Sequence, residues 1–269
     1  MDAVGREGGA AVTAEGFGLK GPRGWAFRGV EVDAAPGSLI AIEGPSGSGR
    51  TCLLLALTGR MRASEGTAAV GGFRLPKQLG AVRRVSALAH VPGVTDLDPA
   101  LTVAEHLRER ALLQRRFDGS LRSLLRPRGE RVTEAKLRID TALKAAGLDR
   151  EALPKGGRTS VRDLERAEAL RLSLALALIG RPLLLGVDDT DLKLADAERA
   201  AVWDQLRAIA DAGTTVLAVC SEAPEGATVV STASADTTRT TGTTDPSDTS
   251  DTSDTDKEAA DALTEAGRA

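Results

Sequence analysis

Apolar positions along the chain switch between two spacings, one typical of buried strands and the other of helices. Short apolar runs bounded by Gly or Pro predict strands, whereas longer runs with apolar residues every three or four positions predict helices. The N-terminal strand candidates are residues 15–21, 25–37, 39–45, 67–76 and 85–91. Residues 51–61 carry no helix breaker before Gly59 and predict a helix that follows the third strand and a glycine-rich loop.

The middle of the chain is helical, and strands and helices alternate again after it. Residues 101–117 and 131–148 have helical spacing and few strand formers, which predicts a helical lobe. The elements expected next are a helix at 163–182, a strand at 183–189, a helix at 198–213 and a strand at 214–220. This alternation is typical of an α/β fold with a buried parallel sheet. The composition fits, since 42% of residues are hydrophobic and only 2% are aromatic, so the core consists of Leu, Val, Ile and Ala.

After about residue 228 the sequence consists largely of Thr, Ser and Asp, with almost nothing to bury. We expect residues 229–269 to form a disordered tail, in which 257–269 could at most form a frayed helix. Residues 231–269 carry a net charge of −6, which leaves +3 for the rest of a chain whose total is −3. The folded part is therefore mildly basic and the tail acidic.

Nothing in the sequence predicts secretion or a membrane span. The N-terminus has no apolar run after its charges, and the apolar stretch 170–187 is interrupted by Arg, Gly and Pro. The two cysteines, Cys52 and Cys220, are too few for a disulfide framework and indicate reduced thiols in the cytoplasm. Any role at a membrane is expected to come through a partner.

The segment EGPSGSGRT, residues 43–51, nearly matches the phosphate-binding loop G-x-x-x-x-G-K-[ST]. A strand before it and a helix after it provide the context that this loop requires, although a glycine-rich surface turn is the alternative. Small residues let backbone N–H groups reach phosphate oxygens, and the following helix presents its positive end to the same phosphates. The predicted nucleotide contacts are Gly44, Pro45, Ser46, Gly47, Ser48, Gly49, Arg50, Thr51 and Cys52.

Two adjacent acids, Asp188 and Asp189, end the apolar strand at 183–189. Mg²⁺ in phosphate sites takes one or two carboxylates together with phosphates and waters. We therefore predict that Thr51 and Asp188 bind Mg²⁺ and that Asp189 lies near the attacking water. A simple strand-ending turn is the alternative interpretation of this pair.

These motifs, in this order, resemble the ATP-binding subunit of an ABC transporter over residues 13–225. The segments that carry the resemblance are GVEVDAAPGSLIAIEGPSGSGRTCLLLALTGRMRASEGTAAVGGFRLP, LDPALTVAEHL, ALALIGRPLLLGVDD and TTVLAVCSE. The resemblance implies a P-loop NTPase fold of the ABC-cassette type, with a parallel core sheet, an antiparallel strand layer and an inserted helical lobe. It places this domain at 13–228, its lobe at about 102–165 and the acidic tail at 229–269.

The resemblance also implies cofactors and partners. These are ATP and Mg²⁺, a second cassette in a homodimer or heterodimer, and a separately encoded transmembrane permease contacted through the helical lobe. The protein would then be cytoplasmic, peripheral to the inner face of the cell membrane, and would need no nucleic acid.

Several positions depart from the family pattern in ways that affect catalysis. Arg50 replaces the loop lysine, and its planar guanidinium is not equivalent to a compact ammonium. Of the signature Leu-Ser-Gly-Gly-Gln, only the leucine remains in Leu164–Glu168. Asp189 stands where the family has a catalytic glutamate, and Ser221 stands in place of the switch histidine.

Three further assignments stay open in the sequence. The family's Q-loop glutamine aligns with either His90 or Gly93, depending on where a gap is placed. Trp25 lies near the position of the aromatic residue that stacks on adenine, but it could equally be a core or edge residue. The arginine-rich segment 107–131 could be a solvated face or a basic surface near a membrane partner or anionic lipid.

We therefore expect an ATP-binding subunit that couples ATP binding, and possibly hydrolysis, to a permease. The first alternative is a degenerate cassette that binds nucleotide without turnover and acts as a structural or regulatory partner. A second, from another class, is a P-loop small-molecule kinase whose lid would be the arginine-rich segment 107–131.

Overall fold

The computed structural model describes residues 8–117, 128–190 and 194–232. The expected tail beyond residue 232 lies outside these ranges, and so does the frayed helix expected at 257–269. Residues 118–127 of the arginine-rich segment also lie outside them.

A five-stranded parallel sheet forms the centre of the fold, in the order β6-β7-β8-β3-β9. The strands are β3 (Leu39–Glu43), β6 (Ser86–Leu88), β7 (Leu184–Val187), β8 (Thr215–Cys220) and β9 (Thr228–Ser231). Every neighbouring pair is parallel. All residues of β6, β7 and β8 are buried, as expected for strands covered on both faces. The parallel sheet predicted from the alternation of elements is confirmed.

A second sheet is antiparallel and has the order β2-β1-β4-β5. Its strands are β1 (Val12–Gly21), β2 (Gly24–Ala34), β4 (Glu65–Val70) and β5 (Phe73–Leu75). This is the antiparallel strand layer expected from the family resemblance.

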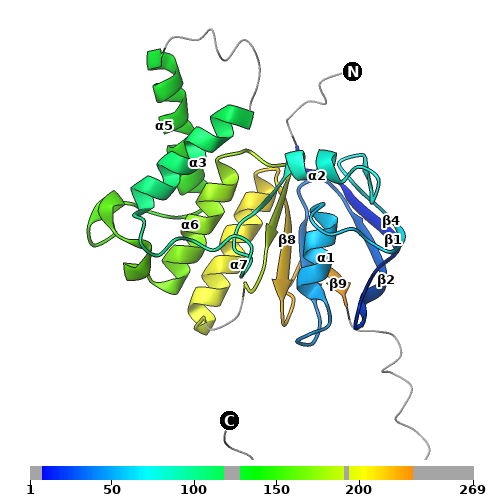
Figure 1. Ribbon diagram of the computed structural model, residues 1–269. Helices are drawn as coiled ribbons and strands as arrows, with labels where there is room; N and C mark the ends of the chain where they lie inside the picture. Colours follow the sequence, from blue (N-terminus) through cyan, green and yellow to red (C-terminus); the bar gives the residue numbers. More distant parts are fainter. Residues whose placement is uncertain (1–7, 118–127, 191–193, 233–269) are drawn as a thin grey trace, which may run out of the picture. The chain divides into compact units, whose positions relative to one another are not determined.

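The helices cover the two sheets from different sides. They are α1 (Arg50–Leu57), α2 (Leu79–Val85), α3 (Val103–Phe117), α5 (Arg128–Ala145), α6 (Arg166–Leu178) and α7 (Asp196–Asp211), with short 3-10 turns at Gly156–Arg158 and Val161–Asp163. In Figure 1, α3, α5 and α6 lie on one side of β8, and β1, β2 and β4 lie on the other. Helix α1 contacts β8, β3 and β2, so it packs between the two sheets.

Two apolar clusters hold these layers together. The first joins one face of the parallel sheet to α3, α5, α6 and α7, and it includes Leu107, Leu172 and Trp203. The second joins the other face to α1 and the antiparallel sheet, and it includes Phe17 and Leu53. The parallel sheet is therefore packed on both faces, which fixes its strand ends relative to α1 and α6.

The strand expected at 67–76 is two strands, β4 and β5, with Gly71 and Gly72 between them. Two further details differ from the sequence expectations. Strand β9 crosses the boundary placed at residue 228, and its Val229 and Val230 pair with β3, so these residues belong to the sheet and not to the tail. The strand expected at 85–91 is shorter, because residues 79–85 form α2 and only Ser86–Leu88 pair with β7. Both errors arise where an element is too short for periodicity to identify it.

The second cluster can be tested at Phe17, which is fully buried and lies 5.8 Å from Phe27 between ring centroids. We expect Phe17→Ala to lower the free energy of unfolding by about 3–5 kcal/mol, because it leaves a cavity between layers. Leu137→Ala on α5 is the control, since Leu137 is 61% exposed and should change stability by less than about 0.5 kcal/mol. Equal shifts in denaturant midpoint for both variants would contradict this account of the core.

Candidate functional site

The predicted site residues gather at one edge of the parallel sheet. The carboxyl ends of parallel strands meet at the same edge, and ligands bind there in open α/β sheets. The residues that follow the strands are Gly44 after β3, Asp188 after β7, Ser221 after β8 and Thr232 after β9. Segments far apart in the sequence are thus brought together by strand order alone.

The glycine-rich loop is fitted closely to β2. Gly49 has a φ of +84°, and a Cβ atom there would lie 1.9 Å from the carbonyl oxygen of Ala26. Only glycine meets both conditions. Gly49 also caps α1, and its carbonyl accepts the Leu53 N–H at 2.9 Å. The first N–H groups of α1 have no intrahelical acceptor, so they form the electropositive end expected of a phosphate site.

A second contact fixes the loop to the end of β9. The Ser48 and Thr232 hydroxyls lie 2.6 Å apart, and the Thr232 N–H donates to the Glu43 carbonyl at 2.9 Å. At position 44 a Cβ atom would lie 2.4 Å from the Thr232 hydroxyl, which explains the glycine there. Sequence reasoning missed Thr232 because it assigned this position to the tail. The β-branched run Thr-Val-Val at 228–230 was the available signal.

Thr51 and Asp188 meet directly. The Thr51 hydroxyl donates to Asp188 Oδ2 at 2.6 Å, and Asp188 Oδ1 accepts the Asp189 N–H at 2.9 Å. Burial raises the pKa of Asp188; the Thr51 hydrogen bond opposes that rise. A buried carboxylate beside a hydroxyl is a set of hard oxygen donors, which suits Mg²⁺. The residues present therefore fit the predicted metal site.

Arg50 points across the site to β8. Its Nη1 atom donates to the Cys220 carbonyl, and its positive charge acts on Asp188. The guanidinium thus connects the phosphate loop to the strand that precedes Ser221. The neighbouring Cys52 is half-buried, and burial, together with the charge of Asp188, raises the pKa of its thiol. Cys52 is therefore no reactive thiolate.

Asp189 has an unusual backbone conformation. Its φ of +50° is left-handed, a region that few residues other than glycine occupy, although Asp tolerates it better than most. The next residue, Thr190, is buried and donates its hydroxyl to the Val219 carbonyl at 2.9 Å. Thr190 thus holds the turn after β7 to β8. The half-buried Asp189 lies between two residues whose side chains are hydrogen-bonded, Asp188 and Thr190.

Of the two Q-loop candidates, His90 lies beside the carboxylates. Its carbonyl accepts the Asp188 N–H at 2.7 Å, whereas the Gly93 N–H bonds to Asp96. Burial lowers the pKa of His90, and the charge of Arg166 lowers it further, while the nearby acids oppose both. The imidazole is therefore neutral at physiological pH.

The segment Leu164–Glu168, aligned with the family signature, begins α6. Its Glu165 N–H donates to the Glu168 carboxylate at 2.9 Å. A carboxylate at a helix N-terminus is stabilised by the helix dipole. The same charge disfavours a phosphate at that position. This helix start is therefore built for self-capping rather than for anion binding.

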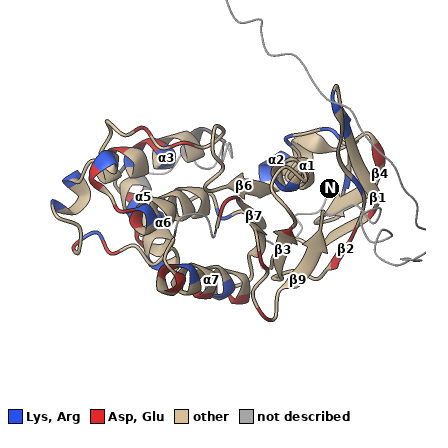
Figure 2. Cartoon of the chain, turned by 90° about the horizontal axis from the view of Figure 1, so that it is seen from below, with Lys and Arg blue, Asp and Glu red and all other residues tan. Residues whose placement is uncertain are grey.

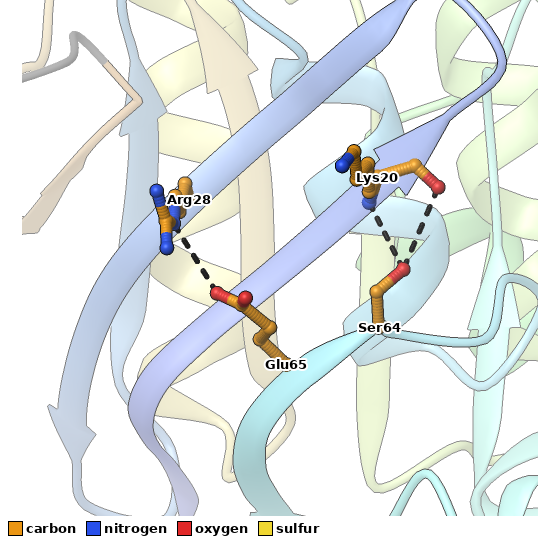
Figure 3. A network of polar contacts seen from close by, with 4 residues as sticks. All are labelled: Lys20, Arg28, Ser64 and Glu65. Carbon is orange, nitrogen blue, oxygen red and sulfur yellow. Dashed lines mark hydrogen bonds and ion pairs between the residues drawn. The ribbon is translucent and has the colours of Figure 1, made fainter.

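Trp25 on β2 is 36% exposed and neighbours the carbonyl that contacts Gly49. The Arg28 guanidinium lies 4.6 Å from its ring centroid and the Lys20 ammonium 5.6 Å. Figure 3 shows that the Arg28 guanidinium pairs with Glu65 at 3.2 Å, and that the backbone N–H of Lys20 donates to the Ser64 hydroxyl at 3.0 Å. Trp25 is thus an edge residue close to the loop, and its stacking on adenine stays a prediction.

Known proteins share this arrangement of motifs. The family model described as "ABC transporter" matches residues 27–191, which is more than half of the chain. The chain belongs to the ABC transporter family. Its cassette is 30% identical over 189 residues to the Nod factor export ATP-binding protein I of Cupriavidus metallidurans, which covers 70% of this chain and 55% of that protein. It is also 30% identical to the daunorubicin resistance ATP-binding protein DrrA3 of Streptomyces coeruleorubidus, over 77% of this chain and 59% of that protein.

The cassette therefore spans little more than half the length of these curated relatives. Solved structures support the fold. The ATP-binding cassette MJ0796, as a dimer bound to ADP and Pi, superposes with a TM-score of 0.60 at 20% identity, over 78% of this chain and 88% of that one. The cbiO1 protein of Clostridium perfringens, part of the transporter complex cbiONQ, gives 0.63 at 18%, over 80% and 79%. Within the described ranges of this cassette, no helix is long and apolar enough to cross a membrane.

The buried carboxylate predicts a pH effect in protein freed of metal by a chelator. The folded-state pKa of Asp188 is above its unfolded value of roughly 3.9, so the protonated carboxyl group stabilises the fold at acidic pH. This stabilisation is lost as pH rises from roughly 3.9 through the folded-state pKa. We expect Asp188→Asn to unfold at higher denaturant concentration than the parent at neutral pH. An asparagine can accept from the Asp189 N–H and donate to Thr51, so both contacts survive.

Adding Mg²⁺ and ATP should reverse this order. The parent should gain stability, since its carboxylate then has a cation, while Asp188→Asn should gain far less. A variant that responds to Mg²⁺ as strongly as the parent would exclude Asp188 from the metal site.

Trp25 can be tested by fluorescence, because the chain has only one other tryptophan, the buried Trp203 on α7. If Trp25 stacks on adenine, ATP should change the emission of the parent but not of Trp25→Phe. The affinity for ATP should fall by about tenfold in Trp25→Ala, in line with the loss of about 1–2 kcal/mol of aromatic contact. Trp203→Phe is the control that should keep the ATP response.

Proposed function

We propose that this cassette binds MgATP at the β3–α1 loop and couples that binding to a separately encoded membrane permease. The contact between Thr51 and Asp188 carries the proposal, because it joins the phosphate loop to the acidic strand end. The relatives support it, since their names describe ATP-binding proteins of export and drug resistance. What this cassette would help to move stays open.

The proposed contacts of ATP follow from the site. The N–H groups of residues 46–52 would hold the phosphates, Thr51 and Asp188 would hold Mg²⁺, and Trp25 would stack on adenine. A bound Mg²⁺ would offset phosphate charge. If His90 is the Q-loop residue, it would act from beside Asp188, whose backbone N–H its carbonyl accepts.

The proposal extends from ATP binding to ATP hydrolysis. Asp189 would orient or activate the attacking water, Ser221 would lie at the switch position, and Arg50 would offset phosphate charge. Arg50 would first have to exchange its bond to the Cys220 carbonyl for a phosphate. Because Asp is one methylene shorter than Glu, we expect turnover to be slow compared with cassettes that keep the glutamate.

A non-hydrolytic cassette is the second candidate, and one observation favours it. The start of α6, where the family signature would serve the nucleotide of a second cassette, carries Glu165 and Glu168 instead. In a homodimer both composite sites would lack a working signature. In a heterodimer a partner cassette could supply it to this chain's own loop, which makes a heterodimer the better fit. The kinase hypothesis loses its basis, since the family match spans the motifs.

The membrane partner and location are also proposals. We infer that the cassette is cytoplasmic, peripheral to the inner face of the membrane, and attached only through the permease. The relation to cbiO1, part of the complex cbiONQ, supports such an assembly.

The catalytic proposal is tested by steady-state ATP hydrolysis and by equilibrium ATP binding in the same preparations. Turnover should fall by about 100-fold or more in Asp189→Asn, the loss expected when a general base is removed, while ATP affinity stays unchanged. Arg50→Ala should weaken both. Asp211→Asn, an exposed acid at the end of α7, is the matched control and should change neither.

Two results decide between the candidates. Measurable ATP affinity without turnover in the parent supports the non-hydrolytic cassette. Turnover that is indifferent to both Asp189→Asn and Arg50→Ala would refute the assigned roles.

A further inference from the structure

Five arginines gather around one groove that lies outside the nucleotide site. The groove has a volume of about 1140 Å³, and its walls come mainly from α2, β6, the segment after β6, α3, α6 and the turn after α6. None of the residues assigned to the glycine-rich loop or to the carboxylate pair lines it. The nucleotide site therefore does not account for the charge collected here.

The charge of the groove is one-sided. Its lining contains one acid and five arginines, namely Asp96, Arg60, Arg83, Arg84, Arg110 and Arg181. In the described part of the chain none of these arginines forms an ion pair, and Asp96 instead accepts the Gly93 N–H. Figure 2 shows Lys and Arg positions on both α2 and α3, two of the helices that line the groove. The lining thus has a net charge of +4.

The guanidinium of Arg110 has donors to spare. Its Nε donates to the Leu176 carbonyl near the end of α6 at 3.1 Å. A guanidinium carries five N–H donors, and within residues 8–117, 128–190 and 194–232 the four on Nη1 and Nη2 of Arg110 donate to no protein acceptor. Burial lowers the pKa of this side chain. Donors of a half-buried cation that lack protein acceptors favour the binding of an anion.

Arg60 brings a second half-buried cation to the same groove. It donates to the Thr58 carbonyl at 2.7 Å and to the Ser86 hydroxyl at 2.9 Å, so the fold fixes its guanidinium. Burial, together with the charges of Arg83 and Arg110, lowers the pKa of Arg60 to about 10. The three arginines are thus close enough to repel one another, although Arg110 belongs to the lobe and the other two to the sheet side. An anion between them would offset this repulsion.

Size and lining indicate the kind of anion. The volume is slightly above the usual range for small-ligand sites, about 300–1000 Å³, so a single inorganic phosphate would leave most of it unfilled. Half-buried apolar side chains complete the walls, among them Phe73, Leu97 and Leu176. Phosphate oxygens match the arginine fork in bidentate pairs, and a phosphate group carries a charge of about −1.5 to −2 at neutral pH. Two phosphate groups therefore balance the lining, and an apolar body would cover its walls.

We propose that this groove is an anion site separate from the nucleotide loop, which binds a small molecule carrying two phosphate groups on an apolar body. One phosphate would pair with Arg60 and Arg83 on the sheet side, and the other with Arg110 on the lobe. A ligand held at both ends joins the two parts of the cassette, so its binding stabilises the fold. This site is independent of the proposed function, since none of its residues is assigned to ATP.

The probe is adenosine 3′,5′-bisphosphate, which has two separate phosphates on a flat ring system and no phosphate chain for the glycine-rich loop. The matched probes are adenosine 5′-monophosphate and adenosine, with one phosphate and none. Binding to the full chain is measured by calorimetric titration in a chelator, at low and at high salt. Hydrogen exchange then locates the site through peptides that cover residues 79–89 and 103–114.

The groove variant combines Arg83→Gln, Arg84→Gln and Arg181→Gly. All three side chains are exposed, and Arg181 has a φ of +47° that glycine adopts freely, so the fold tolerates the changes. The control removes the same charge from exposed positions outside the groove, through Arg23→Gln, Arg158→Gln and Arg162→Gln.

We expect the bisphosphate to bind at least about tenfold more tightly than the monophosphate, in a salt-sensitive manner, and adenosine not to bind. Exchange should slow in the peptides of α2, β6 and α3, and the denaturant midpoint should rise with bisphosphate concentration. The groove variant should lose about tenfold in affinity, while the control keeps the parent's value.

Four results would overturn the proposal. They are no binding of the bisphosphate, equal affinity for the bisphosphate and the monophosphate, equal losses in the two variants, and slowed exchange confined to residues 44–52. A fifth arm uses vesicles of anionic lipid as competitors. We expect no competition, because Arg60 and Arg110 lie partly buried inside the groove, and full displacement would assign these arginines to lipid headgroups and not to a soluble ligand.

This outcome is separable from that of the proposed function. The groove variant should bind ATP like the parent, because none of its three positions lies in the nucleotide site. Loss of the bisphosphate with ATP affinity intact supports the groove site alone. Failure of the parent to bind ATP would refute the proposed function, whatever the bisphosphate does.

Discussion

The parallel pairing of β3 with β8 is the constraint on which the rest of the site depends. It aligns Leu39 with Val216 and Glu43 with Cys220, so the two strands end at the same level. With β7 on the other side of β8 and β9 on the other side of β3, four strand ends meet within reach of α1. The bonds from Thr51 to Asp188, from Arg50 to Cys220 and from Ser48 to Thr232 each join the phosphate loop to one of the other three ends. A slip in the register of β3 with β8 or of β8 with β7 would separate the phosphate loop from Asp188, and a slip of β9 along β3 would separate it from Thr232.

The family fold and the phosphate loop could be predicted from the sequence because both depend on local signals. A buried apolar strand, a run of glycines and a helix without breakers are each visible in a short window. Thr232 could not be found in this way, because its role depends on β9 pairing with β3 across nearly the whole chain. That His90, and not Gly93, lies beside the carboxylates likewise depends on the hydrogen bond from Asp188, a contact that gap placement cannot reveal, and which of the two is the Q-loop residue stays a prediction. Whether Trp25 contacts a nucleotide depends on a ligand and stays a prediction.

The substitutions in the cassette separate two tasks that the same loop could serve. The loop keeps the backbone geometry expected of a phosphate-binding loop, since Gly44 and Gly49 both have positive φ and a Cβ atom at either position would meet close neighbours. The side chains that would drive turnover are altered in length or in charge, from Arg50 and Asp189 to the acidic start of α6. Backbone-dependent binding tolerates such changes, whereas catalysis depends on side-chain placement to within about an ångström. Under the proposed function, this cassette would keep nucleotide binding, while its turnover would depend on what a partner contributes.

The contact between Ser48 and Thr232 has a practical consequence for how the domain is delimited. Composition alone suggests cutting the chain at residue 228, where Thr, Ser and Asp begin to dominate. Such a cut would remove most of β9 and the Thr232 hydroxyl that bonds to Ser48 in the phosphate loop, although every recognisable motif would remain. A shortened or fused version of this cassette should therefore keep the chain through Thr232, because residues that look like linker hold its glycine-rich loop in place.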